Sequence, residues 1–124
     1  MKQLLPVLAL LLTFDAPAEE VTELYLDAGT CWLRERGVAV KEDPVSIRGR
    51  KEDDGCRAFI VDKEFKKRFK SCVYSGFFVS AAANASWYGC GFSREHESFM
   101  FEARMDKDNP GPENIECKYI CYLK

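Results

Sequence analysis

The chain has a single histidine, His96, which lies among charged residues in the segment Arg94-Glu95-His96-Glu97. Histidine titrates near neutral pH, so a histidine beside carboxylates is suited to general acid–base catalysis. A small secreted nuclease that uses His96 with Glu95 or Glu97 is therefore one functional hypothesis. The simpler interpretation is a solvated turn between two strands. A nuclease also needs an opposing base and a phosphate-binding arginine, and the sequence alone does not bring such residues to His96.

No other stretch of the sequence carries a catalytic pattern. The serines lack a nucleophile-elbow sequence, no glycine-rich phosphate loop follows a strand pattern, and the pair Asp53-Asp54 lies in an expected turn. No CxxC pair and no cysteine–histidine cluster has the spacing of a zinc site. We therefore expect a protein that is not an enzyme and that has no catalytic residues, no metal and no cofactor.

Four lysines form the first candidate binding surface. Lys63, Lys66, Lys67 and Lys70 follow an expected helix start and would give that helix a basic outer face. Such a face can dock an anionic partner, but it is also the ordinary polar side of an amphipathic helix, and two acidic residues dilute it. The net charge of −2 gives no global field that would attract nucleic acid, so we expect no nucleic-acid partner.

A second candidate surface surrounds the N-glycosylation acceptor sequence Asn84-Ala85-Ser86. In a secreted chain this sequence indicates an exposed loop, with Asn84 as the predicted glycosylation site. Aromatic side chains are expected mainly in the core, but so small a domain exposes some of them. We expect the aromatic residues beside this loop, Trp87 above all, to contact a partner. The aromatic residues considered are Trp32, Phe77, Phe78, Trp87, Tyr88, Phe99, Phe101, Tyr119 and Tyr122.

The first eighteen residues read as a secretory signal peptide. They combine an early lysine, an apolar run from Leu4 to Phe14 and a small-residue end, Ala16-Pro17-Ala18. The apolar run is too short to span a membrane. We therefore predict an extracellular protein with one mature domain, residues 19–124, that is a monomer without a membrane span.

All six cysteines lie in this predicted mature domain: Cys31, Cys56, Cys72, Cys90, Cys117 and Cys121. An even number of cysteines in a secreted chain predicts three disulfides, for which fifteen pairings are open. Each disulfide stabilises a small domain by roughly 2–4 kcal/mol. If residues 115–123 form a strand, Cys117 and Cys121 lie about 13 Å apart and must bind different elements.

One helix is expected. Asp62 is a suitable N-cap, and Phe65, Phe69 and Cys72 then recur at the spacing of one buried helical stripe, which predicts a helix near residues 63–71.

Strand patterns cover most of the remaining chain. Residues 73–80 have apolar side chains on both faces, which predicts a central strand. Residues 49–55 are charged and bounded by glycines, which predicts an exposed loop with a potential processing site at Arg50-Lys51. The other expected strands are residues 22–26, 31–40 with an interruption near Gly37, 45–48, 57–61, 87–92, 98–105 and 115–123.

These elements predict an α+β domain that is mainly antiparallel β. The expected architecture is a small sandwich or barrel of about seven short strands with one helix, stapled by three disulfides. A ferredoxin-like arrangement with a second helix is the alternative.

Several short motifs resemble those of a known family. They are Asp53-Asp54-Gly55-Cys56, Phe59-Ile60-Val61-Asp62, Cys72-Val73-Tyr74-Ser75-Gly76, Trp87-Tyr88-Gly89-Cys90-Gly91 and Ser98-Phe99-Met100-Phe101. In these segments the chain resembles the secreted fungal proteins related to the Alternaria major allergen, which include inducers of the plant hypersensitive response. The resemblance implies extracellular life, a β-rich disulfide fold, no cofactor and interaction with host defence. It supplies no catalytic residues.

The leading functional hypothesis is a secreted, cysteine-rich, effector-like protein. It would bind a host (plant) or competitor target and modulate defence without catalysis. The nuclease that uses His96 is the alternative from another class. A secreted toxin that acts on membranes is a third hypothesis, although no free amphipathic cationic segment favours it.

Overall fold

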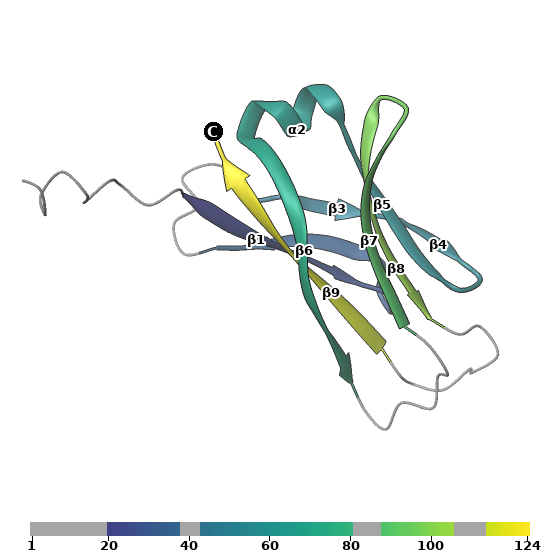
Figure 1. The fold of residues 1–124 in the computed structure, drawn as a ribbon. Helices are drawn as coiled ribbons and strands as arrows, with labels where there is room; N and C mark the ends of the chain where they lie inside the picture. The colour runs from purple at the N-terminus through teal and green to yellow at the C-terminus, as the bar shows by residue number, and fades with distance from the viewer. Residues whose placement is uncertain (1–19, 38–42, 81–87, 106–113) are drawn as a thin grey trace, which may run out of the picture.

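The computed structural model describes residues 20–37, 43–80, 88–105 and 114–124, which form two antiparallel sheets and one short helix (Figure 1). The strands of the first sheet are β1 (Val21–Asp27), β2 (Trp32–Arg36), β3 (Ser46–Arg48), β6 (Phe69–Ser80) and β9 (Asn114–Leu123). Those of the second are β4 (Arg50–Glu52), β5 (Gly55–Val61), β7 (Tyr88–Glu95) and β8 (Ser98–Met105). Their orders are β3-β2-β1-β9-β6 in the five-stranded sheet and β4-β5-β8-β7 in the four-stranded sheet. The predicted α+β class, mainly antiparallel β, is confirmed.

The two sheets enclose one hydrophobic core. In β1 the side chains alternate, with Leu24 and Leu26 buried and their neighbours partly exposed, as a strand with one inward face requires. Tyr119 of β9 reaches across to the four-stranded sheet. Its hydroxyl lies 2.8 Å from the carbonyl oxygen of Gly91 and 3.0 Å from that of Glu102. Both carbonyl oxygens accept from this hydroxyl, in a shared hydrogen bond. Burial raises the pKa of Tyr119, so the phenol keeps the proton that it donates.

Three disulfides join these elements, and all six cysteines take part. Cys31–Cys56 and Cys90–Cys117 each connect the five-stranded side of the core to the four-stranded sheet. Cys72–Cys121 links directly opposed residues of the neighbouring strands β6 and β9. The prediction that Cys117 and Cys121 bind different elements is therefore confirmed.

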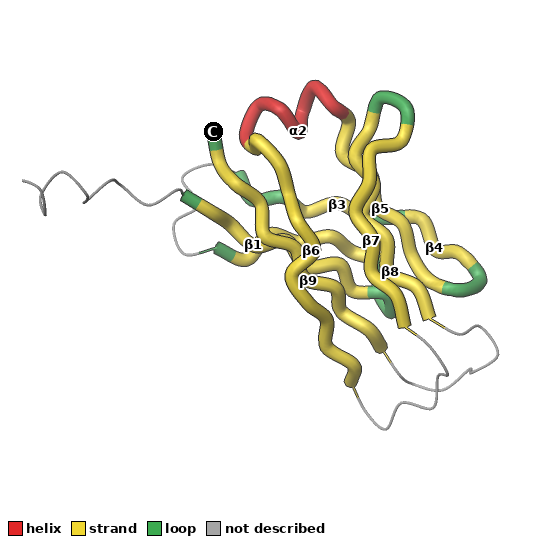
Figure 2. Tube along the Cα trace, in the orientation of Figure 1, coloured by secondary structure: helices red, strands yellow, loops and turns green. Residues whose placement is uncertain are grey.

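The helix α2 (Asp62–Arg68) carries the chain from the four-stranded sheet to the five-stranded sheet at one end of the molecule (Figures 1 and 2). Its predicted position is confirmed, but its predicted bounds are wrong. Val61 is the N-cap residue and makes no side-chain cap hydrogen bond, so Asp62 does not cap the helix. Phe69 already belongs to β6, where it pairs with Leu123, because strand pairing replaces the expected last helical turn.

Two strand predictions need correction. β6 lies at an edge of the five-stranded sheet and not in its centre. The prediction took apolar side chains on both faces to mean burial on both faces, but several of these side chains are exposed. The expected loop over residues 49–55 is a hairpin, in which β4 pairs with β5 and only Asp53 and Asp54 form the turn. Its charges pair with one another, since Glu52 forms ion pairs with Arg50 and Arg57 at 3.2 and 3.8 Å.

Several predictions are confirmed only in part or lie beyond the described residues. The strand expected over residues 31–40 begins at Trp32 and ends at Arg36, and residues 38–42 are outside the described ranges. The first eighteen residues, predicted to be a signal peptide, also lie outside them. The described ranges hold one helix, so they do not provide the second helix of the ferredoxin-like alternative. That helix is too short and too polar to cross a membrane.

A buried ion pair connects four segments of the fold. The carboxylate of Glu35 on β2 accepts hydrogen bonds from both Nη atoms of Arg68 at 2.6 and 2.8 Å, from Thr22 Oγ1 at 2.7 Å and from the Val45 amide at 3.0 Å. Burial by itself would raise the pKa of Glu35. The hydrogen bonds from Arg68, Val45 and Thr22 outweigh burial, so the pKa of Glu35 lies below its ordinary value.

Candidate functional site

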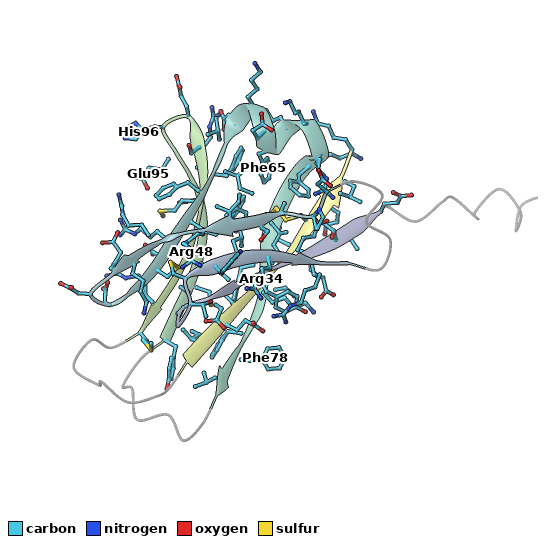
Figure 3. The ribbon with its side chains drawn as sticks, turned by 180° about the vertical axis from the view of Figure 1, so that it is seen from behind. Arg34, Arg48, Phe65, Phe78, Glu95 and His96 are labelled. Atoms are coloured by element: carbon cyan, nitrogen blue, oxygen red, sulfur yellow. A yellow bond between two sulfur atoms is a disulfide. The ribbon has the colours of Figure 1, made fainter. Side chains whose placement is uncertain are left out.

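The turn between β7 and β8 carries the predicted catalytic histidine. His96 has a positive φ of 57° in this turn, and Glu95, His96 and Glu97 are all exposed. Figure 3 shows Glu95 and His96 at the tip of the hairpin, on its outer side. The described residues place no hydrogen-bonding partner on the imidazole, and they contain no group of three histidine, cysteine or acidic residues that would hold a metal ion. Among the described residues, His96 thus lies in an exposed turn.

Contacts at this turn are structural. The Glu97 carbonyl accepts a hydrogen bond from the Asp62 amide at 2.8 Å, and Arg94 forms an ion pair with the Asp62 carboxylate. The hairpin tip is thereby tied to the start of α2, which leaves Arg94 occupied by a carboxylate and not free for a phosphate.

The predicted basic surface is largely neutralised. Lys66 pairs with Asp62 at 3.9 Å, and Lys67 pairs with Glu64 at 3.0 Å, both within the helix. Lys70 lies on β6 and not on the helix, so the four lysines do not share one helical face. The other predicted surface residues, Asn84 and Trp87, lie outside the described ranges.

The structure places a different apolar surface on β6. Val73, Tyr74, Phe77 and Phe78 are 45%, 46%, 49% and 65% exposed, and they are four of the six large apolar side chains that the described part of the chain exposes. We call these four residues the β6 apolar strip. Phe77 and Phe78 are therefore among the aromatic residues that this small domain exposes.

An irregularity in β6 places Tyr74 and Phe77, which are three residues apart, on the same face of the strand. The register with β9 shifts between Tyr74 and Gly76, so the alternation of side chains changes there. The ring of Tyr74 lies 6.4 Å from that of the directly opposed Tyr119 on β9 of the same sheet. The ring of Phe77 lies 6.3 Å from that of Tyr88 on β7 of the four-stranded sheet.

The strip also has an open edge and little charge. β9 is the only strand that pairs with β6 in the described residues, so the other backbone edge of β6 has no strand partner there. Residues 71–80 contain no charged side chain. Edge strands of soluble proteins usually carry charges or proline that discourage pairing with another chain. This segment has neither, which makes it suited to contact with a partner.

A second surface lies on the outer face of the five-stranded sheet, at β2 and β3. The guanidinium carbons of Arg34 and Arg48 lie 4.4 and 4.6 Å from the ring centre of Trp32. Figure 3 shows the two arginines on this part of the sheet. We call Trp32, Arg34 and Arg48 the arginine–tryptophan cluster. Trp32 is partly exposed and is thus one of the aromatic residues that do not lie in the core.

These surfaces are only partly predictable from sequence patterns. The run from Val73 to Val79 is conspicuously apolar, but an apolar run on both faces of a strand fits a central strand as well as an exposed edge. Trp32 and Arg34 share a strand face because they are two residues apart, whereas Arg48 joins them only through the pairing of β2 with β3.

No protein-family model matches this chain, and neither does any curated protein or solved structure.

Proposed function

We propose that this chain is a secreted recognition protein of effector type. It acts as a monomer with a small disulfide-stapled β-sandwich, and it binds a protein target of a host plant or competitor and thereby modulates defence, without catalysis. The observation that carries this proposal is the β6 apolar strip on an open sheet edge.

The chemistry of the strip fits a protein partner. Aromatic side chains are enriched at the centres of protein interfaces, where they bury large areas at a small cost in side-chain entropy. An open edge can accept the main chain of an extended segment, and neighbouring side chains then select its sequence. Because residues 71–80 are uncharged, the favoured partner segment is extended, apolar and uncharged.

The extracellular location is supported by the cysteine chemistry. The six cysteines form three disulfides, which persist in oxidising compartments and are rare in the cytosol. The signal-peptide pattern of the first eighteen residues and the resemblance to allergen-like fungal proteins point the same way.

The proposal is tested by removing the strip without disturbing the core. The purified, oxidised protein is applied to leaf tissue, and the dose that gives a half-maximal defence response is measured. Val73→Ser combined with Phe78→Ser removes two exposed apolar groups and should raise that dose at least tenfold. Val61→Ser is the matched control, because Val61 is 54% exposed but lies on β5, away from the strip. Circular dichroism verifies that the variants fold.

The outcomes separate this proposal from its alternatives. A wild-type protein that elicits no response, or a double variant as potent as wild type, would overturn it. RNA cleavage by the wild type that His96→Ala abolishes would establish the nuclease instead. Leakage of dye from liposomes would favour the membrane-acting toxin.

A further inference from the structure

The arginines of this chain divide into two groups. All eight lie in the described residues, and six pair with a carboxylate. The pairs are Arg36–Glu116, Arg50–Glu52, Arg57–Glu102, Arg68–Glu35, Arg94–Asp62 and Arg104–Asp54. Arg34 and Arg48 have no such partner among the described residues, and both are exposed. Within the described ranges, the two arginines that have no carboxylate partner are the two that flank Trp32.

The sheet holds these three residues in one arrangement. Trp32 and Arg48 are directly opposed on β2 and β3, and Arg34 follows Trp32 by two residues on the same face of β2. The indole Nε1 of Trp32 donates a hydrogen bond to Ser46 Oγ at 2.8 Å, which fixes the orientation of the ring. The ring therefore acts as a rigid support on which both guanidinium groups rest.

This arrangement prepares the arginines to bind an oxyanion. A guanidinium that rests on an aromatic ring uses its flat face for that contact and keeps its N–H groups, which lie in its plane, available as donors. Those donors match the spacing of oxygens on a sulfate, phosphate or carboxylate group. The ring also limits the movement of both side chains, so less side-chain entropy is lost when an anion binds.

The surroundings favour a polyanionic sugar chain over a protein. None of the six exposed large apolar side chains lies on β2 or β3, so a protein would find no apolar centre at the cluster. Among the exposed neighbours on these strands, Ser46 is uncharged and Arg36 is paired with Glu116. A polymer that binds through its charges needs no apolar centre, and an open sheet face can accommodate an extended chain.

We propose that the arginine–tryptophan cluster binds the sulfate groups of a sulfated polysaccharide. Sulfated sugar polymers are extracellular, so the choice of sulfate rests on the secreted location given in the proposed function. The cluster is separate from the β6 apolar strip, and binding to it does not require the strip. The protein would thereby be retained on sulfated surfaces near its target.

The test measures affinity for heparin by surface plasmon resonance, with the oxidised full-length secreted protein. Arg34→Ala and Arg48→Ala should each weaken binding by about five- to tenfold, the range expected for a charge-assisted hydrogen bond at a partly solvated site. Each should also lower the slope of log affinity against log salt by about one, because fewer counterions are released. Arg50→Ala is the matched control, because Arg50 is exposed but pairs with Glu52 on β4, and it should change affinity less than twofold.

Further variants and ligands test the geometry and the chemical class. Trp32→Leu keeps both charges and removes the support, so it should weaken binding by about threefold or more. Dextran sulfate should compete with heparin, and polyglutamate and polyphosphate should compete at least tenfold less well.

The proposal is overturned if the wild type does not bind heparin at about 0.15 M salt, or if Arg34→Ala and Arg48→Ala bind as well as Arg50→Ala. Equal competition by polyglutamate or polyphosphate would overturn the assignment to sulfate. Because this assay involves no host tissue, its failure is distinct from failure of the proposed recognition function.

Discussion

Replacing Arg68 by methionine tests the buried ion pair with Glu35. The side chain of Glu35 is 0% exposed and that of Arg68 is 18% exposed, so the variant leaves a buried carboxylate without its cation. Breaking a buried pair in this way costs about 3–5 kcal/mol of unfolding free energy. Hydrogen bonds from Thr22 and Val45 remain in the variant, so we expect the lower end of that range, about 3 kcal/mol.

The measurement is equilibrium unfolding in urea, followed by circular dichroism with the disulfides intact. With a slope of about 2 kcal/mol per molar urea, a loss of 3 kcal/mol lowers the midpoint by about 1.5 M. Glu35→Gln and the double variant complete a cycle, and we expect the double variant to be less destabilised than the sum of the two single variants. Arg36→Met is the control, because its pair with Glu116 is more exposed and should contribute less than about 1 kcal/mol.

Two results would refute this reasoning. One is an Arg68→Met variant that is no less stable than Arg36→Met. The other is strict additivity of Glu35→Gln and Arg68→Met, which would show that the two side chains contribute independently.

Three further predictions follow from the same fold. Because the pKa of Glu35 is lower in the folded state, ionised Glu35 stabilises the fold fully at a pH above the ordinary carboxyl pKa, and this contribution is lost as the pH falls through the lowered pKa. Thermal unfolding at about pH 6 and pH 2 should therefore show a smaller loss of stability for Glu35→Gln than for the wild type. Peptide mapping by mass spectrometry should recover the pairs Cys31–Cys56, Cys72–Cys121 and Cys90–Cys117, and six free thiols in secreted material would contradict the fold. Tyr119→Phe removes the hydroxyl that donates to the partly buried carbonyl groups of Gly91 and Glu102, and it should lower the free energy of unfolding in urea by about 1–2 kcal/mol. A change below about 0.5 kcal/mol would show that this hydrogen bond contributes little.

Local patterns in the sequence were sufficient where one element has one buried face. The alternation over residues 98–105 predicts β8, in which Phe101 and Ala103 are buried and the other residues are partly exposed. The helix position follows from the spacing of Phe65 and Phe69, but its end does not. Phe69 is buried, which a helical stripe would also require, but it pairs with Leu123, which is distant in the sequence. This pairing makes Phe69 part of a strand.

The features that the sequence did not predict depend on contacts between distant segments. The hairpin of β4 and β5 resembles a solvated loop in sequence because it is short and rich in charged residues. In the structure Glu52 pairs with Arg50 on the same strand and with Arg57 on the opposite strand. The disulfide pairing remained open for the same reason, since the order of the strands decides which cysteines meet. Likewise, the cation–π contacts of Trp32 with Arg48 need the register of β2 with β3.

The place of β9 in the chain constrains when this protein can fold during its synthesis. β9 pairs with both β1 and β6, supplies one cysteine to each of two disulfides and carries Tyr119, yet the ribosome makes it after the other eight described strands. Until residues 114–123 emerge, β1 and β6 have no common neighbour, and Cys72 and Cys90 lack their native partners. Once Cys72 and Cys90 are made, they stay without their native partners until β9 follows, whereas Cys31 and Cys56 are both available earlier. Formation of two of the three native disulfides is consequently a late event in synthesis.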